Sequence, residues 1–328
     1  MAVQMSYVIR VVNVLSCILI TCYMKSFSLA LLLLCGSAMA QVPITLPLTV
    51  VNTPLPKGYI QVGTSQYTDL TRFRGVPANL TEKVLRTAVT VAGQASYESF
   101  LRGEIDRATW EQTEKRVGAD TIHLSRKPLK QQINTLVGTN TTGQRVVIVD
   151  ANNNQDFSDD KVLTYALELP QIPKKKDGTF DNTSMHAVLD TLPAVSVIVE
   201  AYDGRQIIQR TVWFKPVPYN TGWLYPNPEE NRFHLSLLSH EYRQANTVLM
   251  GQPIQFLIIT TPGLGYNTKS ARIEIREAGQ AVNKLLSEGH YQSGYTFILA
   301  NHVLEITRLS VQGDQLTILD KGLTAPAR

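Results

Sequence analysis

The chain has 328 residues, of which 44% are hydrophobic and 18% charged. This is the composition of a folded globular protein and excludes a largely disordered one. The formal net charge is only +4, and such a small excess argues against a protein that binds nucleic acid through a concentrated basic face.

The first forty residues have the layout of a secretory signal peptide. Met24–Lys25 supplies a start and a positive charge, a short apolar run follows at 27–35, and small residues end it at Ala38–Ala40. The run is shorter than the roughly 20 residues that span a bilayer. We therefore expect a leader at residues 1–40, translation from Met24 and no stable membrane span after cleavage. The alternative is an uncleaved anchor that includes the upstream apolar stretch.

The cysteines restrict the chemistry of the exported chain. They lie at Cys17, Cys22 and Cys35, all within the leader. A chain that begins at Gln41 therefore has no disulfide, no thiol–disulfide exchange and no cysteine nucleophile. Removing Arg10 and Lys25 with the leader lowers the formal charge from +4 to +2.

The first part of the exported chain combines extended and strand-like patterns. Residues 41–57 contain several prolines, which oppose a helix, so an extended lead-in or an edge strand is expected. Residues 83–92 have the β-branched alternation of a strand. Asn79 with Glu82 resembles a helix capping box just before them, but the alternation favours the strand.

Helix is expected between Ser96 and Val117. Ser96 is placed to cap a short segment that ends at Gly103, and Asp106 to cap a second segment that ends at Gly118. Beyond about residue 120 the pattern is mainly that of strands.

Turn signals place several hairpins in the rest of the chain. Residues 195–202 alternate well, Asp203-Gly204 supplies a two-residue turn, and residues 206–214 form the returning strand. Two further pairs are expected, 247–250 with 254–260 and 303–311 with 315–319. The fold class is therefore predicted to be mainly β with a minor helical segment, built as β-sandwich-like domains.

A Pro-rich segment at 219–231 is interpreted as a linker or a long loop and marks a boundary between domains. The expected order is a leader at 1–40, a mixed extended and helical region at 41–120, a β-rich domain with an acidic loop at 121–218, and a second β-rich domain at 219–328.

Recognisable chemistry is concentrated in residues 150–160, which read Asp-Ala-Asn-Asn-Asn-Gln-Asp-Phe-Ser-Asp-Asp. Oxygen-bearing side chains occupy the first, third, fifth, seventh and ninth positions, as in EF-hand or dockerin-type loops, and calcium prefers such ligands. The carboxylates also repel one another unless they are solvated or neutralised. The predicted ligands of a structural calcium ion are Asp150, Asn152, Asn154, Asp156, Ser158, Asp159 and Asp160.

Two departures from the EF-hand pattern leave an alternative open. Gln155 stands at the sixth position, where glycine makes the sharp turn, and Lys161 stands at the twelfth, where a bidentate carboxylate is usual. The expected flanking elements are strands at 145–149 and 162–169, whereas helices flank an EF-hand. The alternative is a solvated loop of Asx turns without an ion.

No catalytic or cofactor-binding residue is predicted. His234, His240 and Glu241 match no zinc spacing, and the chain contains no G-x-S-x-G nucleophile elbow. Five aromatic residues either line a carbohydrate or peptide groove or, as is more common in β-proteins, pack in cores and edges: Trp110, Trp213, Tyr219, Trp223 and Tyr225.

The stretch 119–160, with ADTIHLSRKPLKQQINTLVG followed by RVVIVDANNNQDFSDD, resembles a region of exported bacterial thioredoxin-like (TlpA-type) thiol–disulfide oxidoreductases. It is similar to the β-rich part that precedes the redox module. The resemblance implies envelope localisation and an accessory role. The reductase activity does not carry over, because this chain has no C-x-x-C pair and no cysteine after Cys35.

Together these features predict a non-catalytic, exported β-rich binding or accessory protein in the periplasm or on the surface of a Gram-negative-type bacterium. A protein or glycan partner in the cell envelope is expected, and calcium is the expected structural cofactor of the loop at 150–160. The alternatives are an accessory subunit of an envelope thioredoxin-like reductase and an envelope hydrolase that uses carboxylates brought together by the fold.

Overall fold

Antiparallel β-sheets make up most of the structure, and the predicted mainly β fold with a minor helical part is confirmed. In the computed structural model, 51% of the described residues lie in strands and 14% in helices, arranged as four antiparallel sheets and three α-helices. The described residues are 42–53, 61–117, 121–167, 176, 182–219, 233–260, 266, 271–279, 284–290 and 294–324. The predicted leader and most of the segment 219–231 lie outside them.

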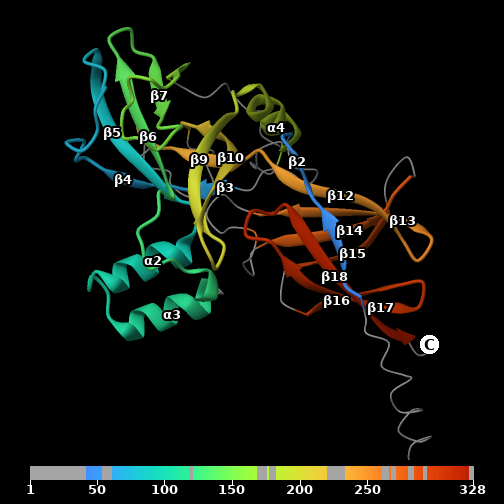
Figure 1. The fold of residues 1–328 in the computed structure, drawn as a ribbon. Helices are drawn as coiled ribbons and strands as arrows, with labels where there is room; N and C mark the ends of the chain where they lie inside the picture. The colour runs from blue at the N-terminus through green and yellow to red at the C-terminus, as the bar shows by residue number, and fades with distance from the viewer. Residues whose placement is uncertain are drawn as a thin grey trace, which may run out of the picture. The chain divides into compact units, whose positions relative to one another are not determined.

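Two of the sheets face each other across one core (Figure 1). The first has the order β4 (Ser65–Tyr67), β5 (Leu80–Val89), β6 (Gln132–Asn140), β7 (Arg145–Val149) and β8 (Val162–Tyr165). The second has the order β3 (Gln61–Gly63), β11 (Ser236–Ser239), β10 (Ile207–Val217) and β9 (Val195–Tyr202). Ile133, Val147 and Phe214 are members of the buried cluster that joins the two sheets. We call this pair of sheets the first sandwich.

The β9–β10 hairpin forms at the position that the sequence predicts. Tyr202 pairs with Ile207, and the ladder continues to Val195 and Phe214. The Asp203 carboxylate accepts the backbone N–H groups of Arg205 and Gln206, each at 2.8 Å. Gly204 has a φ of +93°, which glycine adopts without steric cost.

The other two sheets enclose a second core. One has the order β15 (Lys284–His290), β14 (Arg272–Glu277), β13 (Gln252–Ile259), β12 (Tyr242–Leu249) and β2 (Thr49–Val51). The other has the order β1 (Ile44–Pro47), β18 (Gln315–Thr324), β17 (His302–Leu309) and β16 (Tyr295–Leu299). Phe256 and Phe297 meet edge to face in this core, with ring centroids 6.0 Å apart. We call this pair the second sandwich.

The remaining predicted hairpins are both present. β17 and β18 pair around Gly313, which has a φ of +70°. β12 and β13 pair from Leu249 with Gln252, so their turn consists of Met250-Gly251, both with positive φ. The returning strand therefore begins two residues before the predicted Ile254 and contains Pro253.

The N-terminal strands contribute to sheets formed mostly by distant parts of the chain. β1 pairs with β18 along Ile44–Pro47, and β2 pairs with β12 along Thr49–Val51, so the expected edge strand in this segment is confirmed. β1 and β2 thus lie in the second sandwich, whereas β3, β4 and β5 lie in the first. The domain limits expected from the sequence stay a prediction.

Helical residues separate the adjacent strands β5 and β6. This insertion comprises α2 (Ala92–Leu101), α3 (Arg107–Val117) and the 3-10 turn η1 (Thr121–His123). Figure 1 shows α2 and α3 side by side, and the rings of Tyr97, Phe100 and Trp110 pack between them at centroid distances of 5.3 to 6.5 Å.

The helix boundaries differ in part from those that the sequence predicts. The Asp106 carboxylate accepts the N–H of Thr109 at 2.8 Å, as expected of an N-cap. The predicted cap at Ser96 is wrong, because α2 begins at Ala92 and Val91 occupies the N-cap position without a side-chain hydrogen bond. α4 (Asn182–Thr191) lies in a region for which the sequence predicts mainly strands.

Candidate functional site

The loop at 150–160 connects β7 with β8 in the first sandwich. The flanking strand at 145–149 is confirmed, and the second one ends at Tyr165, earlier than the predicted residue 169. Strands on both sides distinguish this loop from an EF-hand, in which helices supply the flanking elements.

Asp150 is the buried centre of the loop. It is 0% exposed, and its two carboxylate oxygens accept the backbone N–H groups of Asn154 at 3.0 Å and Gln155 at 3.1 Å. Burial raises the pKa of Asp150, while the backbone N–H bonds act in the opposite direction. The chain therefore wraps around this carboxylate and supplies donors from its own backbone.

The alternating polar side chains form a series of Asx turns around that centre. Asn152 Oδ1 accepts the N–H of Asn154 at 3.1 Å, and Asn154 Oδ1 accepts the N–H of Asp156 at 2.8 Å. Asp159 Oδ2 accepts the side-chain amides of Asn152 at 3.1 Å and Asn154 at 2.9 Å. The structure thus brings Asn152, Asn154 and Asp159 together by direct hydrogen bonds.

Asp160 closes the loop with a carboxylate that is only half satisfied. Its Oδ1 accepts the N–H of Ala151 at 3.0 Å, whereas its Oδ2 is buried without a hydrogen-bond partner among the described residues. Burial, together with the charges of Asp150 and Asp159, raises the pKa of Asp160 to about 6. A cation bound to this oxygen would offset the repulsion between the carboxylates. It would also give the oxygen the partner that it lacks among the described residues.

Asp156 and Ser158 have a different environment from the other predicted ligands. Asp156 Oδ1 accepts both the N–H and the hydroxyl of Ser158, at 3.0 and 2.6 Å, and its Oδ2 lies 3.2 Å from the exposed Arg74 guanidinium. The bonds from Ser158, and then the charge of Arg74, lower the pKa of Asp156. This carboxylate is already compensated by the protein.

The backbone of the loop adopts the left-handed region twice. Asn153 has a φ of +58° and Gln155 a φ of +62°. Gln155 therefore makes, at the sixth position, the turn that glycine makes in EF-hand loops, at a cost of about 1 kcal/mol. Asn153 tolerates this conformation better. Its side-chain amide also donates to the carbonyl groups of Gln132 at 2.9 Å and Ile198 at 3.2 Å.

The loop connects the two sheets of the first sandwich. Ile198 on β9 donates its N–H to the carbonyl of Ala151 at 2.8 Å, and Asp150 donates its N–H to the carbonyl of Asn134 on β6 at 3.0 Å. The edge of β9 is thereby hydrogen-bonded to the loop that follows β7. A change that limits the motion of the loop therefore also strengthens the link between β6 and β9.

A third segment packs against the loop from residues 72–76. Arg74 exchanges backbone hydrogen bonds with Gln155 and Phe157, at 2.9 and 3.0 Å. Phe157 stacks on Phe73 with ring centroids 5.1 Å apart. Gly75, with a φ of +65°, approaches so closely that a Cβ there would overlap the Ser158 backbone nitrogen.

The donor set of the loop restricts which ion it suits. Among the described residues, no three His, Cys, Asp or Glu side chains are grouped as a metal site. An ion in the loop would therefore rely on amide, hydroxyl or backbone oxygens in addition to carboxylates. Oxygen ligands of this kind suit calcium, whereas zinc prefers nitrogen and sulfur.

Among the described residues, His234, His240 and Glu241 are not grouped as a metal site. His234 Nε2 lies 2.8 Å from Ser236 Oγ, and burial, followed by the charges of Arg86 and Arg145, lowers the pKa of His234 to about 4. His240 donates its backbone N–H to the carbonyl of Trp213.

Of the described members of the aromatic set, Trp110 and Tyr219 pack against other rings, and Trp213 is partly buried. Trp110 belongs to the α2–α3 cluster, and Tyr219 meets Tyr165 edge to face at 6.2 Å. Tyr219 also donates to the carbonyl of Ala166 at 3.0 Å. Trp223 and Tyr225 lie outside the described residues.

A second polar centre is one that the sequence did not reveal as a group. It forms around Tyr266, which contacts Arg210 on β10 and Arg243 on β12, and we call it the arginine–tyrosine cluster. Its members are Arg210, Glu241, Arg243 and Tyr266. One signal was available: Arg210 shares a strand face with Val212 and Phe214, which are buried. A charged residue on the inward face of a strand indicates a special environment.

No helix within the described ranges is both long and apolar enough to cross a membrane. Comparison of the chain with protein-family models, with curated proteins and with solved structures finds no match.

Proposed function

We propose that this protein is an exported, non-catalytic β-rich binding or accessory protein whose loop at 150–160 holds a structural calcium ion. The observation that carries the ion proposal is the buried Oδ2 of Asp160, which has no hydrogen-bond partner among the described residues and lies near the carboxylates of Asp150 and Asp159. Negative charges brought together in a partly buried loop are stabilised by a bound cation.

The ligands would come mainly from one side of the loop. Asp150, Asn152, Asn154, Asp159 and Asp160 supply carboxylate and amide oxygens, and the Asn amides can turn to present oxygen, since the two amide atoms occupy nearly equivalent positions. Asp156 and Ser158 already bond to each other, with Arg74 beside them. They are therefore the weaker members of the predicted set.

The ion would act as a link between the two sheets of the first sandwich. Through Ala151 and Asn153 the loop is bonded to β9, and through Asp150 to β6. Calcium bound to its carboxylates would reduce their repulsion and limit the motion of the loop. The ion supplies neither redox nor hydrolytic chemistry in this proposal.

Calorimetric titration with calcium chloride tests the ion. We expect one site per chain in the wild type and a loss of affinity of roughly tenfold or more in Asp159→Asn and Asp160→Asn, which remove one charge each with little change of shape. The matched control is Asp203→Asn, since Asp203 also caps a turn by accepting backbone N–H groups but lies in the β9–β10 hairpin. No binding by the wild type, or equal binding by all variants, would refute the ion.

The accessory role is supported by the resemblance of residues 119–160 and by the absence of cysteine after Cys35. A partner in the envelope is therefore expected, and an envelope thioredoxin-like reductase is the first candidate. Co-purification of a tagged chain from envelope extracts tests this role. Recovery of such a reductase supports the role, and recovery of the tagged chain alone at native expression contradicts it.

A further inference from the structure

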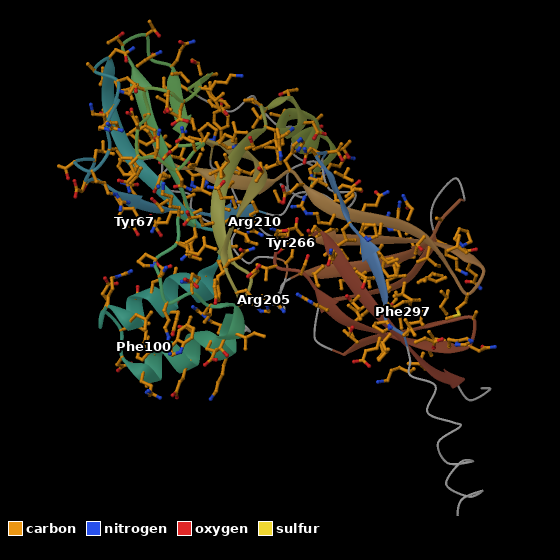
Figure 2. All side chains as sticks on the ribbon, viewed as in Figure 1. Tyr67, Phe100, Arg205, Arg210, Tyr266 and Phe297 are labelled. Atoms are coloured by element: carbon orange, nitrogen blue, oxygen red, sulfur yellow. The ribbon has the colours of Figure 1, made fainter. Side chains whose placement is uncertain are left out.

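The arginine–tyrosine cluster places two buried guanidinium groups beside one aromatic ring. Arg210 and Tyr266, both labelled in Figure 2, lie next to each other. The guanidinium carbon is 5.8 Å from the centre of the Tyr266 ring for Arg210 and 4.9 Å for Arg243. Arg210 is 8% exposed and Arg243 is 5% exposed. Both charges are therefore largely removed from water.

Only one carboxylate in the cluster faces these two charges, and its oxygens are already engaged. Glu241 Oε1 accepts the Tyr266 hydroxyl at 3.0 Å and lies 3.5 Å from Arg243 Nη2. Glu241 Oε2 accepts the backbone N–H of Trp213 at 3.1 Å. The cluster therefore has one positive charge more than its negative charge.

The uncompensated charge belongs to Arg210. Its Nε is buried without a hydrogen-bond partner among the residues that the structure describes. The Nη1 of Arg243 is also buried and has no hydrogen-bond acceptor among the described residues. Desolvation lowers the pKa of Arg210, but a guanidinium keeps its proton in proteins.

Such an arrangement is costly unless something supplies acceptors. A buried charge without a partner destabilises a fold, and buried donors are nearly always hydrogen-bonded to protein, water or an ion. The carbonyl groups of β10 that point toward β9 are used in the ladder, in which Arg210 lies opposite Val199. The Arg210 Nε has no acceptor among the described residues, and a bound group can supply one.

We propose that the arginine–tyrosine cluster binds an oxyanion, the phosphate or carboxylate group of a ligand, with the Arg210 guanidinium as its main donor. A guanidinium presents a planar fork of donors that matches both groups in a bidentate manner. Arg243 adds a second positive charge beside it. This site is separate from the loop at 150–160, so the anion proposal can be tested independently of the calcium ion.

Thermal unfolding with added anion tests the site. Purified protein is dialysed into calcium-free buffer, and inorganic phosphate or acetate is added while sodium chloride holds the ionic strength constant. We expect a saturable rise in the unfolding midpoint with at least one of the two anions, because a ligand that binds the folded state stabilises it. A rise with phosphate alone indicates a tetrahedral ligand group, and a rise with acetate alone indicates a carboxylate.

Variants of Arg210 separate binding from a general salt effect. In Arg210→Gln the rise should disappear, whereas in Arg205→Gln it should persist, because Arg205 is an exposed arginine in the turn of the same hairpin. Calorimetric titration should show an affinity at least roughly tenfold lower for Arg210→Gln. If that variant does not fold, Arg210→Lys replaces it and should weaken binding, since it keeps the charge without the fork.

Two results would overturn the proposal. One is an unfolding midpoint of the wild type that moves with neither anion. The other is an equal shift in the wild type and in the Arg210 variants, which would identify the effect as a general one on the protein surface.

Discussion

The loop at 150–160 and the arginine–tyrosine cluster both bury charge, but only the loop compensates its central charge with its own backbone. Asp150 lies in an irregular loop whose free backbone N–H groups turn inward and bond to it. Arg210 lies in a strand whose carbonyl groups toward β9 are already used in the sheet ladder. Loops can thus solvate a buried anion with their own backbone, whereas a strand offers few acceptors to a buried cation.

The difference has a consequence for stability. Removing a buried charge that is well bonded leaves unsatisfied donors behind and destabilises the fold. Removing a buried charge that lacks partners relieves a desolvation cost and is neutral or stabilising. The loop and the cluster should therefore respond in opposite directions to the loss of their central charge.

The largest effect is expected from Gly75→Ala, which disturbs the packing that holds the loop. The added Cβ would overlap the Ser158 backbone and lie 2.5 Å from an Asp156 oxygen, in a residue with positive φ. We expect a loss of about 3 kcal/mol or more in unfolding free energy, measured by urea denaturation. Gly143→Ala is the control, because Gly143 has a φ of +76° but nothing within 4 Å. Equal losses in both variants would show that the contact with the loop is unimportant.

A smaller and opposite effect is expected from Gln155→Gly. Gln155 is exposed and has a φ of +62°, so glycine relieves the strain at the sixth position of the loop. We expect a gain of about 0.5–1 kcal/mol in unfolding free energy. Gln206→Gly, at an exposed position where φ is not positive, should lose a similar amount. A loss in both variants would contradict the description of the loop as strained.

A further effect concerns pH and the half-buried His234, beside Arg86 and Arg145. Its folded-state pKa of about 4 lies below the unfolded value of about 6.5, so the unfolded chain takes up the proton first. The stability contributed by neutral His234 is therefore complete above about pH 6.5 and is lost as the pH falls toward 4. Unfolding midpoints measured across this window should fall more steeply for the wild type than for His234→Gln. Parallel curves would contradict this account.

Local patterns predicted much of the fold. The β-branched run of β7, the alternation in β9 and the Asp203-Gly204 turn that leads into β10 are properties of short segments, so the sequence alone placed them. The cap at Asp106 was likewise local. The cap at Ser96 was wrong because α2 begins four residues earlier, at Ala92, without any side-chain cap. Tertiary packing, and not a capping signal, fixes that boundary.

The candidate site was predictable in composition but not in its contacts. The alternating oxygen ligands of residues 150–160 were visible in the sequence, and the series of Asx turns follows from them. The supports provided by Phe73 and Gly75 lie more than seventy residues earlier and required the fold. The same holds for Arg210 on β10 and Tyr266 between β13 and β14, which the fold brings together. No local pattern reports such a meeting.

The central claim, that the loop compensates its buried charge whereas the cluster leaves that of Arg210 unpaired among the described residues, is tested most directly by urea unfolding of Asp150→Ala and Arg210→Met in buffer free of calcium and phosphate. We expect Asp150→Ala to lose about 2–3 kcal/mol, because the N–H of Gln155 loses its acceptor and the N–H of Asn154 keeps only Asn152 Oδ1. Arg210→Met should lose less than about 0.5 kcal/mol or gain stability. A loss in Arg210→Met as large as that in Asp150→Ala would contradict the claim.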